Sequence, residues 1–203
     1  MTSIPCNIVM IPSSDTTNDM ILLSEQLKGN NTHFTLKEGA YYPHASLYMA
    51  QINTDMLDEV GRRLLAIAQN TAQITMTPKE YHQDWGYLNV SYTRESLSDK
   101  LQMDVVNAIN PIRDGLRDKD KERLKSAVGK ERENIERYGY RSIGELFAPH
   151  ITITRFKSRE DIDTTKLKNI NNLTAKFTKI GVFEMGDNGT CIRKIVEFNL
   201  GKI

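Results

Sequence analysis

The stretch Tyr42-Pro43-His44-Ala45-Ser46-Leu47-Tyr48 has a counterpart far along the chain, Ala148-Pro149-His150-Ile151-Thr152-Ile153-Thr154. In both stretches a proline precedes a histidine, and a serine or threonine follows the histidine by two positions. Both have the composition of a β-strand, in which successive side chains alternate between faces. Histidine and hydroxyl residue therefore share one face, while the apolar residues between and after them point into a core. Two such strands brought together would set two imidazoles and two hydroxyls around one small space.

The composition is that of an ordinary folded protein. The 203 residues are 39% hydrophobic and 26% charged, with a net charge of +1. This length is enough for one domain with a sizeable core, and we expect a single bilobal domain over residues 1–203 and a monomer. Basic and acidic residues are interspersed, which argues against a partner that is a long duplex nucleic acid.

No targeting or membrane segment is evident. The residues that follow Met1 lack the basic and apolar regions of a signal peptide, and no apolar run approaches 18 residues. We therefore expect a cytoplasmic protein without a membrane partner. Cys6 and Cys191 form no disulfide framework and no Cys-x-x-Cys pair.

Hydrophobic patterning predicts strands and helices in two similar series. Strands are expected near residues 7–11, 32–38, 72–78 and 85–92, with the motif strands near 44–52 and 147–156. Helices are expected near residues 15–28, 55–69, 97–109 and 163–170. A hairpin over 175–185 and 191–200 turns at residues 186–189. This order predicts an α+β fold of two related βα lobes, whose mixed or antiparallel sheets face each other across a central cleft.

The segment 113–137 is the most charged part of the chain, and its charges alternate in sign from Asp118 to Lys125. Such a pattern is typical of a solvated helix or a mobile insertion. A lid over the cleft is the functional alternative.

Paired histidines suit the cleavage of a phosphodiester. The unperturbed imidazole pKa lies near 6.5, so one ring can act as a base while the other, protonated, acts as an acid. The hydroxyls of Ser46 and Thr152 would then donate to the non-bridging oxygens. Neither motif strand contains the Asp, Glu or Cys residues that metal sites usually recruit. We therefore expect neither a metal nor a cofactor. Glycine does not flank Ser46, so there is no nucleophile elbow.

With these motifs the chain resembles the two-histidine (2H) phosphoesterase superfamily, which is defined by two His-x-Ser/Thr motifs flanked by apolar residues. The family includes 2′-5′ RNA ligase-like proteins, RNA cyclic phosphodiesterases, and cellular, viral and phage 2′,5′-oligonucleotide or cyclic-nucleotide phosphodiesterases. The resemblance implies two facing βα lobes with one motif on the central strand of each. It also implies that His44, His150, Ser46 and Thr152 are the catalytic residues.

Beyond the four motif residues, the second motif is similar to that of the RNA ligase-like branch, in which an arginine follows. The resemblance implies that Arg155 contacts a phosphate. The first motif has Tyr48 and Met49 at the matching place, so the two halves are not equivalent. The charged segment is also longer than a compact member of that branch needs.

Five further residues are candidates for substrate contacts, each with a structural alternative. Regular alternation places Tyr48 and Thr154 on the faces of the motif histidines, where they line the cleft or pack below it. Trp85 could stack a base, or its strand face could be covered by a helix. Tyr42 and Phe147 could flank the mouth of the cleft or staple strand ends.

The leading hypothesis is a metal-independent phosphodiesterase acting on a cyclic phosphate or on a 2′-linked or cyclic oligonucleotide. Its partner is then a short or cyclic nucleotide or an RNA end. Two alternatives are RNA end-processing of the 2′-5′ ligase type and a phage or viral enzyme that degrades cyclic-nucleotide immune signals. A third is a non-catalytic nucleotide- or RNA-binding module. The motifs are too nearly symmetric to distinguish acid from base.

Overall fold

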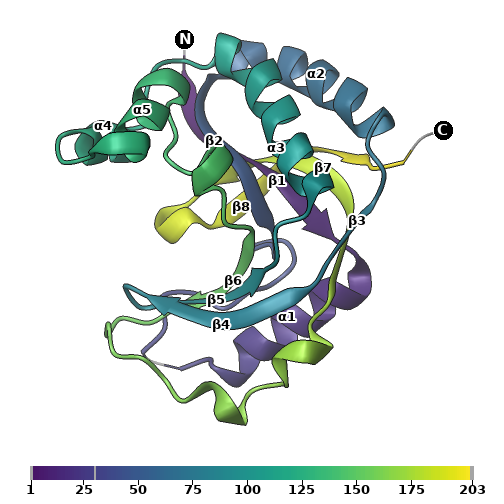
Figure 1. Cartoon of the computed structure of the whole chain (residues 1–203), viewed down its shortest axis with the longest axis vertical. Helices are drawn as coiled ribbons and strands as arrows, with labels where there is room; N and C mark the ends of the chain where they lie inside the picture. The colour runs from purple at the N-terminus through teal and green to yellow at the C-terminus, as the bar shows by residue number, and fades with distance from the viewer. Residues whose placement is uncertain (1, 30, 202–203) are drawn as a thin grey trace.

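The computed structural model describes residues 2–29 and 31–201, and in this part of the chain eight strands form one antiparallel sheet (Figure 1). The strand order is β3-β7-β1-β2-β6-β5-β4, and β8 pairs with β7. The strands are β1 Ser3–Pro12, β2 Ala45–Asn53, β3 Ile74–Met76, β4 Pro78–Asp84, β5 Tyr87–Tyr92, β6 His150–Arg155, β7 Ala175–Met185 and β8 Cys191–Asn199.

Helices cover the sheet in two groups, which define two lobes (Figure 1). The α-helices are α1 Ser14–Gln26, α2 Leu57–Gln69, α3 Ser96–Ile109, α4 Asp118–Leu124 and α5 Gly129–Tyr138. In the first lobe, α2 and α3 pack on β2, β7 and β8; in the second, α1 packs on β6 beside β5 and β4. The predicted α+β fold of two lobes is confirmed, and every strand pairing is antiparallel.

The hydrophobic periodicity that predicted the long helices also identifies which of their residues are buried. In α2 the residues Val60, Leu64 and Ala68 lie on one face and are fully buried, whereas the charged residues lie elsewhere on the helix. At the start of α1, the Ser13 side chain accepts a hydrogen bond from the Thr16 amide, which caps the helix. The predicted hairpin is also present as β7 and β8.

One predicted strand, 85–92, is in fact the second half of a hairpin. Trp85 and Gly86 form its two-residue turn, with φ of 52° and 81°, and β4 precedes them. Positive φ at both turn positions matches the twist of the flanking strands. Sequence patterning missed most of β4 because it is an edge strand with mostly polar side chains, which shows no apolar alternation.

Two other predicted elements are wrong. Residues 32–38 form no strand, because their backbone pairs only through isolated bridges, although Phe34 and Leu36 are buried. Residues 163–170 form no α-helix. Two 3₁₀ turns, Thr164–Lys166 and Ile170–Asn172, occur instead, each opened by an Asp or Asn side chain that accepts a backbone N–H.

The charged segment 113–137 is anchored to the first lobe rather than fully solvated. It contains α4 and most of α5, and its Arg117 and Asp120 are buried. The Arg117 guanidinium pairs with the Asp120 carboxylate at 2.6 Å and also contacts the sulfurs of Met49 and Met185, each at 3.3 Å. Charge alternation predicted helices correctly but not this buried pair. In the described residues no helix is long and apolar enough to cross a membrane.

Candidate active site

The two lobes meet at the two motif strands, where Ala45 of β2 pairs with Ile151 of β6. In this antiparallel register His44 lies opposite Thr152, and Ser46 lies opposite His150. All four side chains are therefore on one face of the sheet. The two histidines are diagonal neighbours, about 7–8 Å apart in such pairs. Strand alternation and one pairing thus bring the four predicted residues together.

Both imidazoles are held in the same way. Nδ1 of His44 lies 2.7 Å from the carbonyl oxygen of Tyr42, and Nδ1 of His150 lies 2.7 Å from that of Ala148. A carbonyl oxygen can only accept a hydrogen bond, so Nδ1 carries the proton in each ring. Nε2 is then the nitrogen that can take up or release a proton. Each contact reaches back two residues, across the motif proline.

Each hydroxyl contacts a buried asparagine on the strand that flanks its motif strand, on the side away from the other motif strand. Asn7 Nδ2 of β1 donates to Ser46 Oγ at 2.8 Å, and Thr152 Oγ1 donates to Asn89 Oδ1 of β5 at 2.8 Å. Sequence reasoning missed both asparagines. The only signal was a polar residue at a buried position within an apolar strand, since Asn7 is fully buried and Asn89 nearly so.

A bulge follows the hydroxyl residue in each motif strand. The register shifts at Leu47, where Ser46 lies opposite Val9 and Tyr48 opposite Ile8. The same shift occurs at Ile153, since Thr152 lies opposite Asn89 and Thr154 opposite Leu88. A bulge interrupts the alternation of side chains. Two features that no motif records, the carbonyl contact and the bulge, are therefore repeated in both lobes.

Comparison with known proteins supports this two-lobed arrangement. No family model and no curated protein matches the sequence, but solved structures do. E. coli LigT in its apo form matches with a TM-score of 0.61 over 100% of both chains, at 10% identity. TT0787 of Thermus thermophilus matches with a TM-score of 0.61 over 98% of both chains, at 12% identity. E. coli LigT complexed with 3′-AMP matches with a TM-score of 0.60, over 99% of this chain and 100% of LigT, at 10% identity.

The chain has the same fold as E. coli LigT and TT0787. The predicted resemblance is thereby confirmed at the level of fold. Each lobe of this chain has one motif at a strand, β2 in the first lobe and β6 in the second.

The bulges in the two motif strands correct two predicted contacts. Tyr48 and Thr154 were expected on the faces of their motif histidines, but each lies opposite a buried residue after the bulge and is itself fully buried. The Tyr48 hydroxyl donates to the Tyr138 carbonyl at 2.5 Å. The Thr154 hydroxyl donates to the Phe34 carbonyl at 2.6 Å. Neither side chain lines the site.

The bulge at Ile153 also determines where Arg155 lies. After the bulge it lies opposite Tyr87, with its guanidinium 4.7 Å from the centre of that ring. Its Nη1 donates to Asn188 Oδ1 at 2.6 Å, in the turn between β7 and β8. Asn188 lines the same hollow as His44 and Thr152, so Arg155 lies at the edge of the site. Its pseudo-symmetric position in the first lobe is occupied by Met49, which Arg117 contacts.

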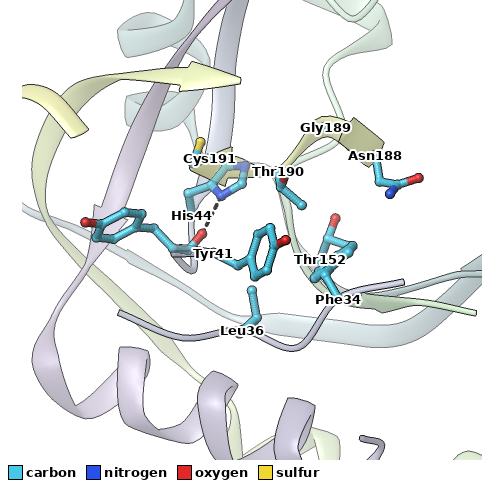
Figure 2. A pocket seen from close by; sticks show the side chains of 10 residues that line it. Phe34, Leu36, Tyr41, His44, Thr152, Asn188, Gly189, Thr190 and Cys191 are labelled. Atoms are coloured by element: carbon cyan, nitrogen blue, oxygen red, sulfur yellow. Dashed lines mark hydrogen bonds between the residues drawn. The ribbon is translucent and has the colours of Figure 1, made fainter. Parts of the chain in front are cut away.

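A small hollow borders the motif residues (Figure 2). His44 and Thr152 contribute to its wall, and the turn between β7 and β8 contributes Asn188, Gly189 and Thr190. Tyr42 also lines it, and its ring packs against Phe183. Figure 2 shows the imidazole of His44 at the hollow, with the hydrogen bond that orients it.

Two other predicted substrate contacts lie elsewhere. Phe147 is buried in the core, with the Arg94 guanidinium 6.0 Å from its ring centre, so its alternative role in packing a strand end is the one found. Trp85 is 60% exposed at the β4–β5 turn, with the Arg159 guanidinium 4.3 Å from its ring centre. Its turn conformation removes it from the strand face on which it was expected.

Electrostatics lower the pKa of both motif histidines. Burial lowers the pKa of His44 to about 4; the Tyr42 carbonyl opposes this shift, and the nearby His150 adds to it. Desolvation also lowers the pKa of His150, although the residue is exposed at the surface; the Ala148 carbonyl opposes this shift, and His82 and Arg141 add smaller lowering contributions. Both rings are therefore neutral at pH 7 in the free protein.

Unsatisfied polar atoms gather beside these residues. Within residues 2–29 and 31–201, three buried side-chain N or O atoms lack a hydrogen-bond partner, and two of them are Asn7 Oδ1 and Arg155 Nε. Buried polar atoms are usually paired, so these exceptions call for a reason. The same residues contain no group of three His, Cys, Asp or Glu side chains placed to hold a metal ion.

Proposed function

We propose that this protein is a phosphodiesterase that uses His44 and His150 as an acid–base pair, without a metal, on a cyclic phosphate or a 2′-linked or cyclic nucleotide. The observation that carries the proposal is the arrangement of the two imidazoles. Each has its Nδ1 proton committed to a backbone carbonyl, and the two flank one space together with two hydroxyls. E. coli LigT, which has the same fold, binds 3′-AMP, a nucleotide with a phosphate on a ribose oxygen.

The chemistry follows from two proton transfers. With a 2′,3′-cyclic phosphate, the base removes a proton from water as the water oxygen bonds to phosphorus. The acid then donates a proton to the ribose oxygen as its bond to phosphorus breaks. With a 2′-linked nucleotide that has a free neighbouring hydroxyl, that hydroxyl replaces water and a cyclic phosphate is left. Ser46 and Arg155 would stabilise charge on the non-bridging oxygens.

We assign the role of base to His44. Its pKa of about 4 keeps Nε2 unprotonated across the neutral range. His150 is then the acid, and water reaches its ring, so a proton can return to it from solvent after each turnover. The anionic phosphate of a bound substrate raises the pKa of both rings, which favours the protonated form that an acid needs.

The pH dependence of kcat/KM tests this assignment. The base is active above the His44 pKa of about 4, and the acid is active below the His150 pKa, which lies under 6.5. We expect a bell-shaped profile with its maximum between these values, because kcat/KM reports the free protein. The profile of kcat should be displaced to higher pH, since the substrate anion raises both pKa values. A kcat/KM that still rises between pH 7 and pH 9 would contradict the assignment.

A substrate panel tests the activity itself. The protein should be incubated with 2′,3′-cyclic, 3′,5′-cyclic and 2′,5′-linked nucleotides, with and without EDTA, and the products separated by chromatography. We expect cleavage of at least one ribose-linked phosphodiester at an unchanged rate in EDTA. Loss of cleavage in EDTA would refute the metal-independent mechanism. Binding of these nucleotides without cleavage would favour the non-catalytic module, and joining of RNA ends would favour the ligase-type reaction.

A further inference from the structure

A second cavity, of about 340 Å³, adjoins the hollow at His44, between the first-lobe strands β1, β7 and β8 and the start of α1. Its walls come from the end of β1, from β7 and β8, from the start of α1 and from the turn at residues 38–39. A cavity of this volume is within the range of small-molecule sites in proteins. The motif residues His44, Ser46, His150 and Thr152 are not among those that line it, so the mechanism above leaves it without a role.

Tyr42 connects this cavity to the catalytic residues. It lines both the cavity and the hollow whose wall includes His44. Pro43, which directly precedes His44 in the chain, also lines the cavity. The Tyr42 ring packs against Phe183, with 5.0 Å between ring centres, and Phe183 also lines the cavity. A ligand in the cavity would therefore lie beside the phosphate site, against aromatic side chains.

The polar groups of the cavity suit an uncharged ligand. Lys179 and Lys194 both form ion pairs with Glu197, at 2.7 Å and 2.9 Å. With Glu38, the charged residues that line the cavity are two lysines and two glutamates. The cavity therefore has no excess of positive charge that would bind another phosphate. Ser14 and Thr17 add hydroxyls that can hydrogen-bond to a sugar or a base.

We propose that this cavity binds the nucleoside attached to the phosphate that His44 and His150 hold, with its base against the aromatic side of the cavity. The inference rests on the proposed function and names a substrate feature beyond it. Recognition of the nucleoside then comes from β1, β7, β8 and the start of α1, whereas the chemistry occurs where β2 and β6 meet. Stacking of a base on aromatic side chains is the main expected source of affinity.

Binding measurements with two probes test this inference without requiring turnover. Calorimetric titration compares 3′-AMP, which carries a nucleoside, with inorganic phosphate, which does not. Two variants fill the cavity from different walls: Ser14→Trp from the start of α1, and Glu38→Trp from the neighbouring turn. Both positions are exposed in the free protein, so the larger side chain has room. Gln26→Trp, at the exposed far end of α1, is the matched control.

We expect the unmodified protein and Gln26→Trp to bind 3′-AMP at least about 10-fold more tightly than phosphate. Each cavity-filling variant should lose this preference while binding phosphate as before, which also shows that it is folded. Unchanged 3′-AMP binding in both filled variants would overturn the inference, and so would an equal loss for both probes. These outcomes are independent of the substrate panel, whose failure would instead refute the proposed catalytic activity.

Discussion

Replacing either His44 or His150 with alanine is expected to reduce turnover by about 10²–10⁴-fold, the usual contribution of one acid or base. Each variant removes one of the two proton transfers, and no other described side chain makes the same carbonyl contact beside the site. Steady-state kinetics on the best substrate of the panel measures the loss. The double variant should lose little more than the worse single variant, because the two residues act in one concerted apparatus.

His33→Ala is the control for these variants. His33 is an exposed histidine outside the motifs, so its removal should leave turnover unchanged. Circular dichroism should show the same fold for all three single variants. If His44→Ala or His150→Ala keeps full activity, that residue has no part in the mechanism, and the symmetric reading of the two motifs fails.

The second large effect concerns stability. Asp120→Ala is expected to lower the free energy of unfolding by about 3–5 kcal/mol, because it leaves a buried guanidinium without its partner. Arg117 is almost completely buried and lies 5.6 Å from the centre of the Tyr140 ring. Apart from the Asp120 carboxylate, its side-chain acceptors among the described residues are two thioether sulfurs, which are weak acceptors. Urea denaturation followed by tryptophan fluorescence or circular dichroism gives the difference.

Asp118→Ala provides the matched control for this pair on the same helix. Asp118 is fully exposed and pairs only with Lys121, so its removal should not change the unfolding midpoint measurably. An apolar double variant, Arg117→Met with Asp120→Leu, should recover most of the loss, since it removes both buried charges. Equal stability of Asp120→Ala and Asp118→Ala would show that the buried pair does not anchor the segment.

The sequence predicted the motif strands and the grouping of the four motif residues because both depend on short-range alternation and on one pairing. It could not predict the bulges, which come from the pairing of β2 with β1 and of β6 with β5. For this reason Tyr48 and Thr154 were misplaced. The placement of Arg155 at the edge of the site came from the family resemblance, since regular alternation alone would have turned it away.

Other features were hidden because they depend on contacts between distant residues. Asn7 and Asn89 each contact a hydroxyl on another strand, and no local pattern distinguishes them from other asparagines. The buried state of Asp120 depends on Arg117, Met49 and Met185 meeting in space, while its local sequence is that of a solvated helix. The polar edge strand β4 lacks the apolar alternation by which strands are recognised.

The sheet has a seam where its two motif strands meet, since a single residue pair, Ala45 with Ile151, joins β2 to β6. Each side of the seam carries one motif imidazole, so the distance between the two rings depends on how β2 and β6 are placed relative to each other. Few backbone hydrogen bonds resist a rocking of one lobe against the other there. In the proposed mechanism, the alignment of base and acid therefore depends on how the two lobes sit relative to each other.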